Sequence, residues 1–254
     1  MSSALLGIDV GGSSIKLAAV DGASGRIVGD VASVPLPMPS TPARVLDAAR
    51  AAAGGPAAGA TGAIGLAIPS VVRGGVALTA ANVDASWIGT DVAGLLAQRS
   101  GRPCVVLNDA DAAGLAEMRF GAGRDLGGVV FVLTLGTGIG TAPFVDGRLL
   151  PNTELGHLHL AGIDAADGEQ YASARVRTQQ GLDWPEWVAR LNRYLGELQR
   201  LFWPDAFILG GAVSEHFDEW GPLVRVAARV LPAQFRGQAG VVGAALAAAE
   251  RYNA

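Results

Sequence analysis

Two similar units in this chain each consist of an apolar strand, a glycine-rich turn and a returning strand. The first covers Ala4 to Val20 and turns at Gly11-Gly12-Ser13; the second covers Val129 to Val145 and turns at Gly136-Thr137-Gly138. Glycine lets the backbone approach a ligand closely, and successive backbone N–H groups can hold a phosphate. An ordinary hairpin turn is the alternative for either unit alone. Together the two units predict two related α/β halves, each with a phosphate-binding turn.

Charged residues flank the first glycine turn. Asp9 lies at the end of the incoming strand, and Lys16, the only lysine in the chain, lies on the returning strand. A lysine ammonium is a compact cation that suits a phosphate group. Lys16 is therefore a candidate phosphate ligand, with chance placement as the alternative.

An amide and a carboxylate follow a third apolar run. Cys104 to Leu107 has the length of a buried strand, Asn108 and Asp109 come next, and a helical pattern starts at Ala112. Ligands of open α/β sheets bind at the carboxyl ends of the strands. Asn108 and Asp109 are therefore candidate site residues; the alternative is that one of them only caps the helix.

Two polar segments are candidates for ligand recognition. The segment from Pro151 to His159 contains Glu154, His157 and His159, too few ligands in view for a metal site. The alternate placement of the two histidines is that expected on a strand. Recognition of a hydroxyl-rich ligand is the functional interpretation, and a surface loop is the alternative. In the loop from Asn82 to Gly89, Trp87 either packs in the core or walls a sugar site.

The other predicted elements complete an α/β pattern. Helices are predicted over Pro42 to Ala53, Asp91 to Arg99, Asp183 to Trp203 and Val241 to Arg251, the third beginning with an Asp183/Glu186 capping box. A strand over Ala206 to Leu209 ends in Gly210-Gly211, where glycine allows a close approach to a ligand.

Composition excludes several classes of protein. Half of the 254 residues are hydrophobic and 17% are charged, which supports a sizeable core and argues against disorder. The net charge of −4 argues against a strongly basic nucleic-acid binder. Cys104 is the single cysteine, so neither an internal disulfide nor a cysteine-based metal cluster can form, which fits a cytoplasmic protein. No signal peptide is evident, and the uncharged stretch from Ala51 to Val72 is too rich in Gly and Pro for a membrane span.

Jointly and in this order, the motifs resemble those of the ROK family of sugar kinases, within the actin-like (ribonuclease H-like) superfamily. Asp9 to Lys16 resembles the first phosphate loop, and Leu135 to Gly140 the second. Asn108-Asp109 resembles the catalytic pair, and Glu154 to His157 the sugar-binding motif. The surrounding residues are most similar to the polyphosphate glucokinase branch of that family.

This resemblance implies a fold of class α/β, with two actin-like lobes around a central cleft. The smaller lobe would span residues 1–107 and the larger 108–239, while a helix over about 240–254 packs back on the first. The implied activity is transfer of a phosphoryl group to the 6-hydroxyl of glucose, with inorganic polyphosphate as donor and magnesium (Mg2+) as cofactor. An ATP-dependent glucokinase or glucomannokinase on the same scaffold is the alternative, and a homodimer is implied in either case.

The resemblance also assigns roles to residues. Asp109 would be the general base, and Asp9 would help to place Mg2+ through water. The sugar would be bound by Asn82, Asn108, Glu154, His157 and Glu169. The donor's phosphates would be held by Gly11, Gly12, Ser13, Lys16, Gly136, Thr137, Gly138, Gly210 and Gly211.

The chain departs from the family pattern at three places. The family's cysteine-rich zinc motif is missing, so no zinc is expected. Glu215 stands where the branch has a lysine, and Ser70 stands where a Pro-Gly pair is usual. Compensating positive charge for a polyanion would have to come from arginines, for which the candidates are Arg119, Arg124, Arg148, Arg175, Arg177 and Arg193.

Two other classes of protein share parts of this pattern. A sugar-responsive repressor of the family would carry a DNA-binding segment ahead of the first glycine turn, which here begins almost at the N-terminus. An actin-like assembly protein would lack the Glu154/His157 motif. We therefore expect a small-molecule kinase with no nucleic-acid or membrane partner.

Overall fold

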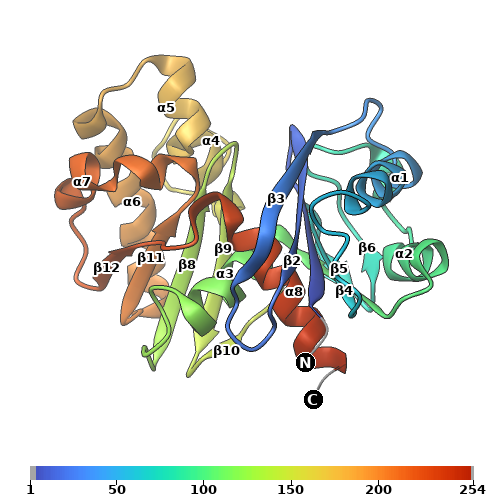
Figure 1. Cartoon of the computed structure of the whole chain (residues 1–254). Helices are drawn as coiled ribbons and strands as arrows, with labels where there is room; N and C mark the ends of the chain where they lie inside the picture. Colours follow the sequence, from blue (N-terminus) through green and yellow to red (C-terminus); the bar gives the residue numbers. More distant parts are fainter. Residues whose placement is uncertain (1–3, 253–254) are drawn as a thin grey trace. The chain divides into compact units, whose positions relative to one another are not determined.

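The computed structural model describes residues 4–252 (Figure 1), and they form two compact units. The first unit comprises the chain up to Ala116 together with the segment from Gln238 onward. The second comprises Glu117–Gly237. Each unit is a mixed α/β structure built around one five-stranded sheet.

The sheet of the first unit has the strand order β3-β2-β1-β4-β7. The first three strands are antiparallel, whereas β1, β4 and β7 run parallel. The strands are β1 (Leu5–Val10), β2 (Ser14–Val20), β3 (Ile27–Pro35), β4 (Ile64–Ile68) and β7 (Cys104–Asn108). A separate small hairpin pairs β5 (Val72–Arg73) with β6 (Val76–Ala77).

The sheet of the second unit, β10-β9-β8-β11-β12, repeats this pattern of directions. β8, β9 and β10 are antiparallel, while β8, β11 and β12 run parallel. The strands are β8 (Val129–Leu135), β9 (Ile139–Val145), β10 (Arg148–Leu149), β11 (Ala206–Gly210) and β12 (Arg229–Pro232). The two strand–glycine-turn–strand segments occupy equivalent positions in the two sheets, which confirms the predicted pair of related halves.

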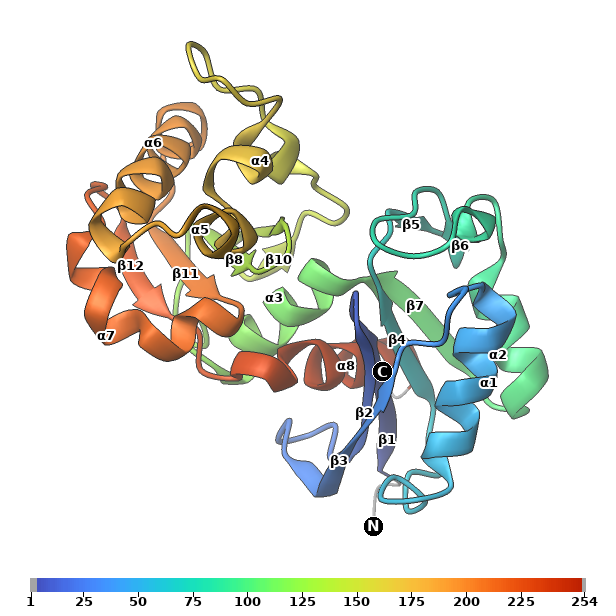
Figure 2. The same ribbon diagram turned by 90° about the horizontal axis from the view of Figure 1, so that it is seen from above.

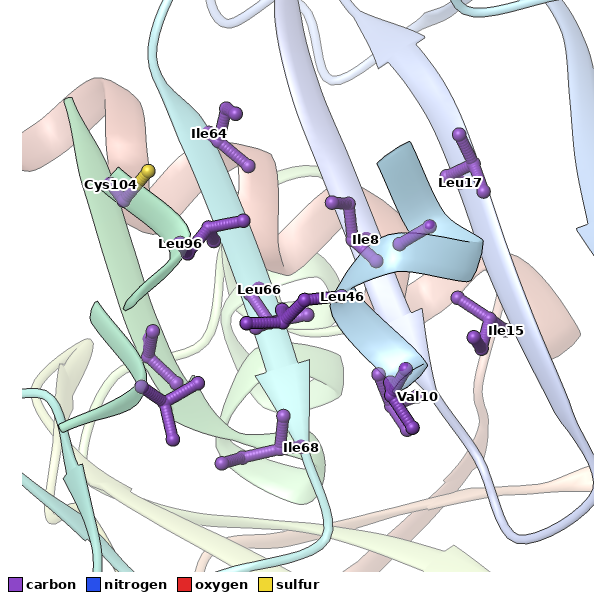
Figure 3. Packing of buried hydrophobic residues seen from close by; sticks show 14 of the residues in the cluster. Ile8, Val10, Ile15, Leu17, Leu46, Ile64, Leu66, Ile68, Leu96 and Cys104 are labelled. Atoms are coloured by element: carbon purple, nitrogen blue, oxygen red, sulfur yellow. The ribbon is translucent and has the colours of Figure 1, made fainter. Parts of the chain in front are cut away.

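Helices cover both faces of the first sheet. In Figure 2, α1 (Pro42–Ala53) and α2 (Val92–Ser100) lie on one face and α8 (Ala239–Tyr252) on the other. Alternation along β1 explains this arrangement, because successive side chains of a strand point to opposite faces. Leu6, Ile8 and Val10 belong to the core beneath α1 and α2, whereas Leu5 packs with residues of α8. Figure 3 shows the core beneath α1 and α2, where Leu46 and Leu96 lie over the strands.

Glycines allow α8 to pack with its backbone directly against its neighbours. A Cβ built at Gly7 of β1 would overlap the backbone carbonyl of Val241, and one at Gly65 of β4 would overlap that of Ala244. A Cβ at Gly243 would overlap the carbonyl of Ala112 in α3 (Asp109–Phe120). Side chains at these positions would hold α8 away from β1, β4 and the start of α3.

One long helix organises the core of the second unit. α6 (Trp184–Phe202) begins with the predicted capping box, in which Asp183 and Glu186 each accept a hydrogen bond from the other's backbone N–H. Its apolar face buries Trp187, Leu191 and Leu198 against β8 and β11. The remaining helices are α4 (Gly168–Ala172), α5 (Ala174–Gln180) and α7 (Phe217–Trp220). Short 3-10 turns are η1 (Ala85–Trp87), η2 (Leu155–His157), η3 (Ala212–His216), η4 (Gly221–Leu223) and η5 (Arg236–Gln238).

The structure corrects one expectation and decides another. His157 belongs to the 3-10 turn η2, so the expectation that His157 and His159 alternate as on a strand is wrong. Trp87 is fully buried and donates its indole N–H to the carbonyl of Ser40, so it is a core residue and not a wall of a sugar site. Within residues 4–252, no helix has the length and apolar character required to span a membrane.

Candidate active site

The first glycine turn joins β1 to β2 and brings several predicted residues together. Gly11 donates its N–H to the carbonyl of Ser14 (2.9 Å), which closes the turn. Asp9 and Lys16 are directly opposite in the β1–β2 register, so their side chains share a face of the sheet. A Cβ at Gly12 would lie 3.6 Å from the Cβ of Asn82, which places Asn82 beside the turn. Asp9, Gly11, Gly12, Ser13, Lys16 and Asn82 thus form one cluster in the first unit.

Asp9 is held in an unusual electrostatic environment. Burial raises the pKa of its carboxyl from 3.8 to about 6, and the nearby Lys16 ammonium only partly opposes this shift. On the same face, a Cβ at Gly240 would come within 2.5 Å of Asp9 Cγ, so the carboxyl lies against the first turn of α8. A single carboxylate suits Mg2+, which keeps most of its water and takes its other ligands from phosphates.

Asn108 and Asp109 occupy the junction between β7 and α3. Asn108 Oδ1 accepts hydrogen bonds from the N–H groups of Ala110 (2.8 Å) and Asp111 (3.1 Å), so this amide caps the helix. Its Nδ2 donates to the carbonyl of Ser70 (3.2 Å). Asn108 therefore caps the helix, and one of its two amide N–H groups takes no part in these bonds. Asp109 is the first residue of α3, at the carboxyl end of a parallel strand.

Ser70 has a structural role in the same neighbourhood. Its buried hydroxyl donates to the carbonyl of Thr79 (2.7 Å), and its own carbonyl accepts from Asn108. The Ser70 hydroxyl therefore forms a hydrogen bond between the loops that flank β5 and β6. Asn108 is anchored by that segment as well as by α3.

The second glycine turn, in the second unit, is fixed from two sides. Gly136 donates to the carbonyl of Gly138 (3.0 Å) and accepts from the N–H of Arg175 in α5 (3.0 Å). Glu169 Oε2 accepts from the N–H of Ile139 (2.9 Å), directly after the turn. A Cβ at Gly138 would overlap the Glu169 carboxylate, so a side chain there would displace Glu169 from this bond. The predicted sugar ligand Glu169 thus also holds the predicted phosphate turn.

The Gly210-Gly211 pair lies beside the same turn. Gly211 has φ +88°, a conformation that favours glycine, and a Cβ there would overlap the backbone of Leu135. It leads from β11 into η3, where Ser214 donates its hydroxyl to the Gly211 carbonyl (2.7 Å). Glu215 is exposed on η3. Gly136, Thr137, Gly138, Gly210 and Gly211 thus gather at the carboxyl ends of β8 and β11.

Glu154 immediately precedes the short turn η2, and His157 is its last residue. The two side chains are 47% and 56% exposed, and His157 Nε2 lies 4.0 Å from Glu154 Oε2. Partial burial raises the pKa of the Glu154 carboxyl, His157 lowers it and Glu169 raises it further. The hydrogen bond with Asp167 is the largest cause that raises the pKa of His157, and burial opposes it. The structure therefore brings Glu154, His157 and Glu169 into one acidic, accessible group.

Asp167 is the site residue that sequence reasoning missed. Its Oδ2 lies 2.8 Å from His157 Nδ1, and its Oδ1 accepts from the N–H of Gln170 at the start of α4. The available signal was an aspartate at a helix N-cap position, two residues before Glu169. Within the part of the chain that the structure describes, no group of three or more His, Cys, Asp or Glu residues could hold a metal ion by itself.

Comparison with known proteins identifies the class to which this fold and these residues belong. The protein-family model described as "ROK family" matches residues 5–175 of this chain. The chain belongs to the ROK family, and its α/β fold, predicted as actin-like, is that of ROK sugar kinases.

Within that family, three relatives have informative names. A polyphosphate glucokinase from Mycobacterium tuberculosis is 44% identical over 242 residues, which cover 95% of this chain and 89% of the relative. The crystal structure of an inorganic polyphosphate/ATP-glucomannokinase from Arthrobacter sp. strain KM superposes with a TM-score of 0.93 at 44% identity, covering 99% and 100% of the two chains. A ROK family glucokinase from Streptomyces griseus, in complex with glucose and AMPPNP, gives a TM-score of 0.82 at 29% identity, with 95% and 98% covered.

Proposed function

We propose that this protein transfers a phosphoryl group from inorganic polyphosphate to the 6-hydroxyl of glucose. The observation that carries the proposal is the 44% identity with a polyphosphate glucokinase over nearly the whole chain, with Asp109, Glu154 and His157 in the places that the motifs require. The exposure of Glu154 and His157 fits a role in binding a hydroxyl-rich ligand.

In this mechanism Asp109 is the general base. As the 6-hydroxyl oxygen forms its bond to the terminal phosphorus, the bond from that phosphorus to the donor's bridging oxygen breaks, and the hydroxyl proton passes to the Asp109 carboxylate. Asn108 fixes the start of α3, and with it the position of this carboxylate. Such a reaction depends mainly on positioning and on neutralisation of charge.

Sugar selection falls to polar side chains that can pair with hydroxyl groups. We assign this role to Asn82, Asn108, Glu154, His157 and Glu169. Glu169 would use Oε1, because its Oε2 already accepts from the N–H of Ile139. A site that pairs each hydroxyl with a partly buried polar group discriminates strongly against sugars that lack one, since the protein group would be left unpaired.

Donor phosphates would be bound by backbone N–H groups of the two glycine turns, and we assign the same role to Lys16, Gly210 and Gly211. Mg2+ would be placed by Asp9 through water, and it would supply charge neutralisation at the donor. Arg175 is the arginine best placed to contribute, because its backbone N–H bonds Gly136 and its guanidinium lies 3.9 Å from Glu169 Oε1.

A second donor, ATP, is favoured by two specific observations. One of the similar structures is that of a polyphosphate/ATP-glucomannokinase, whose name includes both donors. In addition, Glu215 is exposed and acidic, at a position where the resemblance to the polyphosphate branch implies a lysine. An assay of glucose 6-phosphate formation with Mg2+ and either donor separates the two. Turnover with ATP alone would remove polyphosphate from the proposal and keep the sugar kinase.

The test of Asp109 is the Asp109→Asn variant. Turnover should fall by about 10²–10⁴-fold while the KM for glucose changes little, because the amide keeps the shape and loses the base. Asp218→Asn, at an exposed position of α7, is the matched control and should retain wild-type turnover. Near-normal turnover of Asp109→Asn would remove it from the role of general base.

The assembly and location of the enzyme follow from the family resemblance. We propose a homodimer in the cytoplasm, which light scattering of the purified protein and fractionation of cells would check.

A further inference from the structure

The Asp167 carboxylate makes two separate hydrogen bonds. One oxygen, Oδ1, accepts the N–H of Gln170 (2.9 Å) and so caps α4. The other, Oδ2, lies 2.8 Å from His157 Nδ1, ten residues earlier in the chain. The Asp167 side chain is 12% exposed, whereas the His157 ring is 56% exposed. The histidine is therefore held from behind, from the interior of the unit, while its ring faces outward.

This hydrogen bond determines which ring nitrogen a ligand meets. A carboxylate can only accept, so the proton between the two residues belongs to His157 Nδ1. Nε2 is the nitrogen left for a ligand, and it lies on the side of Glu154, whose Oε2 is 4.0 Å away. The ring thus presents one defined atom beside Glu154.

The groups that face His157 are mostly acidic. Glu154 lies at the start of η2, Asp167 at the start of α4, and Glu169 within α4. Arg175 of α5 lies 3.9 Å from Glu169 and offsets part of that charge. The buried Tyr194 ring packs against Gly168, between the two acidic residues of α4. The Asp167 bond therefore ties His157 to a segment that packs on a buried ring.

We propose that Asp167 is a positioning residue for sugar recognition, which fixes the ring and the tautomer of His157 so that Nε2 meets a hydroxyl of the sugar. The inference rests on the proposed function, because it takes His157 as a sugar ligand. Asp167 itself does not contact the sugar. Its cap on α4 and its bond to His157 are separable, since Asn and Ser also cap helices but carry no carboxylate.

The first experiment measures the tautomer and the pKa of His157 directly, without sugar or donor. The chain has three histidines, so ¹⁵N and ¹³C NMR of labelled imidazoles can resolve each one. In Asp167→Asn, the amide can present an N–H to the ring, which would turn Nδ1 into an acceptor and move the proton to Nε2. We expect the His157 tautomer to change and its pKa to fall. The matched control is Glu219→Gln, which breaks the other 2.8 Å histidine–carboxylate pair, at His216, and should alter the His216 signals alone.

The second experiment measures the KM and kcat for glucose. Asp167→Asn and Asp167→Ser should raise the KM for glucose by roughly tenfold to a hundredfold, the range for losing a hydrogen bond to a charged group. They should change kcat by a smaller factor, while Glu219→Gln keeps wild-type constants. Retained α4 signals in the NMR spectra show that the variants are folded.

The two experiments distinguish two kinds of failure. Unchanged His157 signals in Asp167→Asn, or changed signals with an unchanged KM in an active enzyme, overturn the positioning role and leave the proposed function intact. Wild-type protein that neither phosphorylates nor binds glucose overturns the proposed function, and the sugar role of Asp167 with it.

Discussion

Because α8 packs directly against α3, the Gly243→Ala substitution tests whether the fold can accommodate a side chain at this contact. A Cβ at Gly243 would lie 3.0 Å from Ala112 Cα and would overlap the carbonyl carbon and oxygen of the same residue. Carbon and oxygen atoms pack at about 3.5 Å, so the two helices must separate by more than about 1 Å. All three Ala112 atoms belong to the backbone, so no side chain can rotate away to make room.

The expected loss of stability from the steric overlap exceeds the gain in stability from the higher helix propensity of alanine. Replacing glycine by alanine inside a helix contributes about 1 kcal/mol in favour of the variant. Overpacking costs about 1–3 kcal/mol, with larger values where the backbone itself must move. Since α8 also packs directly on Gly7 of β1 and Gly65 of β4, the helix cannot shift freely. We expect a net loss of roughly 2 kcal/mol, a large part of a typical stability of about 5–15 kcal/mol.

The measurement is urea unfolding, combined with hydrogen exchange of α8 amides to localise the change. Gly196→Ala is the matched control, because Gly196 lies inside α6 and nothing comes within 4 Å of a Cβ there. That variant should be unchanged or more stable by about 0.5–1 kcal/mol. Turnover of Gly243→Ala should also fall, since α3 begins with Asp109. Equal stability of the two variants would refute the packing argument.

Two further substitutions test buried carboxylates. The pKa of Asp9, about 6 in the folded protein against an ordinary 3.8, means that the folded state binds the proton more tightly. The free energy of unfolding of the wild type should therefore fall as pH rises from about 4 to 6, when it is measured without divalent metal. Relative to Asp9→Asn, the fall should be roughly 3 kcal/mol. Parallel stability–pH profiles of the two proteins would contradict this. The second is Glu117→Gln: Glu117 is 1% exposed and accepts from the N–H groups of Ala122, Gln234 and Phe235 at 2.7–3.1 Å. Its replacement should cost at least about 2 kcal/mol in thermal or urea unfolding, because an amide offers one acceptor where the carboxylate offers two, and a wild-type midpoint would show that these bonds contribute little.

Local signals in the sequence predicted the elements well. The strands around both glycine turns, the helix from Pro42 to Ala53 and the capping box at Asp183 appear where the sequence pattern predicted them. The structure also confirms that the two turn units are equivalent, since both sheets have the same strand order and directions. These features depend on residues within a few positions of one another, which is why a single sequence specifies them.

Predictions that needed a distant partner were less complete. The alternation expected for His157 and His159 fails because the chain forms a 3-10 turn there, with His157 held by Asp167. Trp87 could not be assigned from its polar loop, because its partner, the Ser40 carbonyl, lies 47 residues earlier. The residue roles assigned to the sugar and the donor remain predictions that the variants above will test.

The sequence by itself determined the α/β class, the repeated glycine turns, the ROK motifs and the identity of the polar residues that follow the strands. Tertiary structure alone decided how those residues are held: Asn108 by Ser70 and α3, His157 by Asp167, and the Gly136–Gly138 turn by Glu169 and Arg175. The physical reason is that residue type and local spacing set which groups a segment offers. Orientation comes from hydrogen bonds between segments that meet only when the chain is folded.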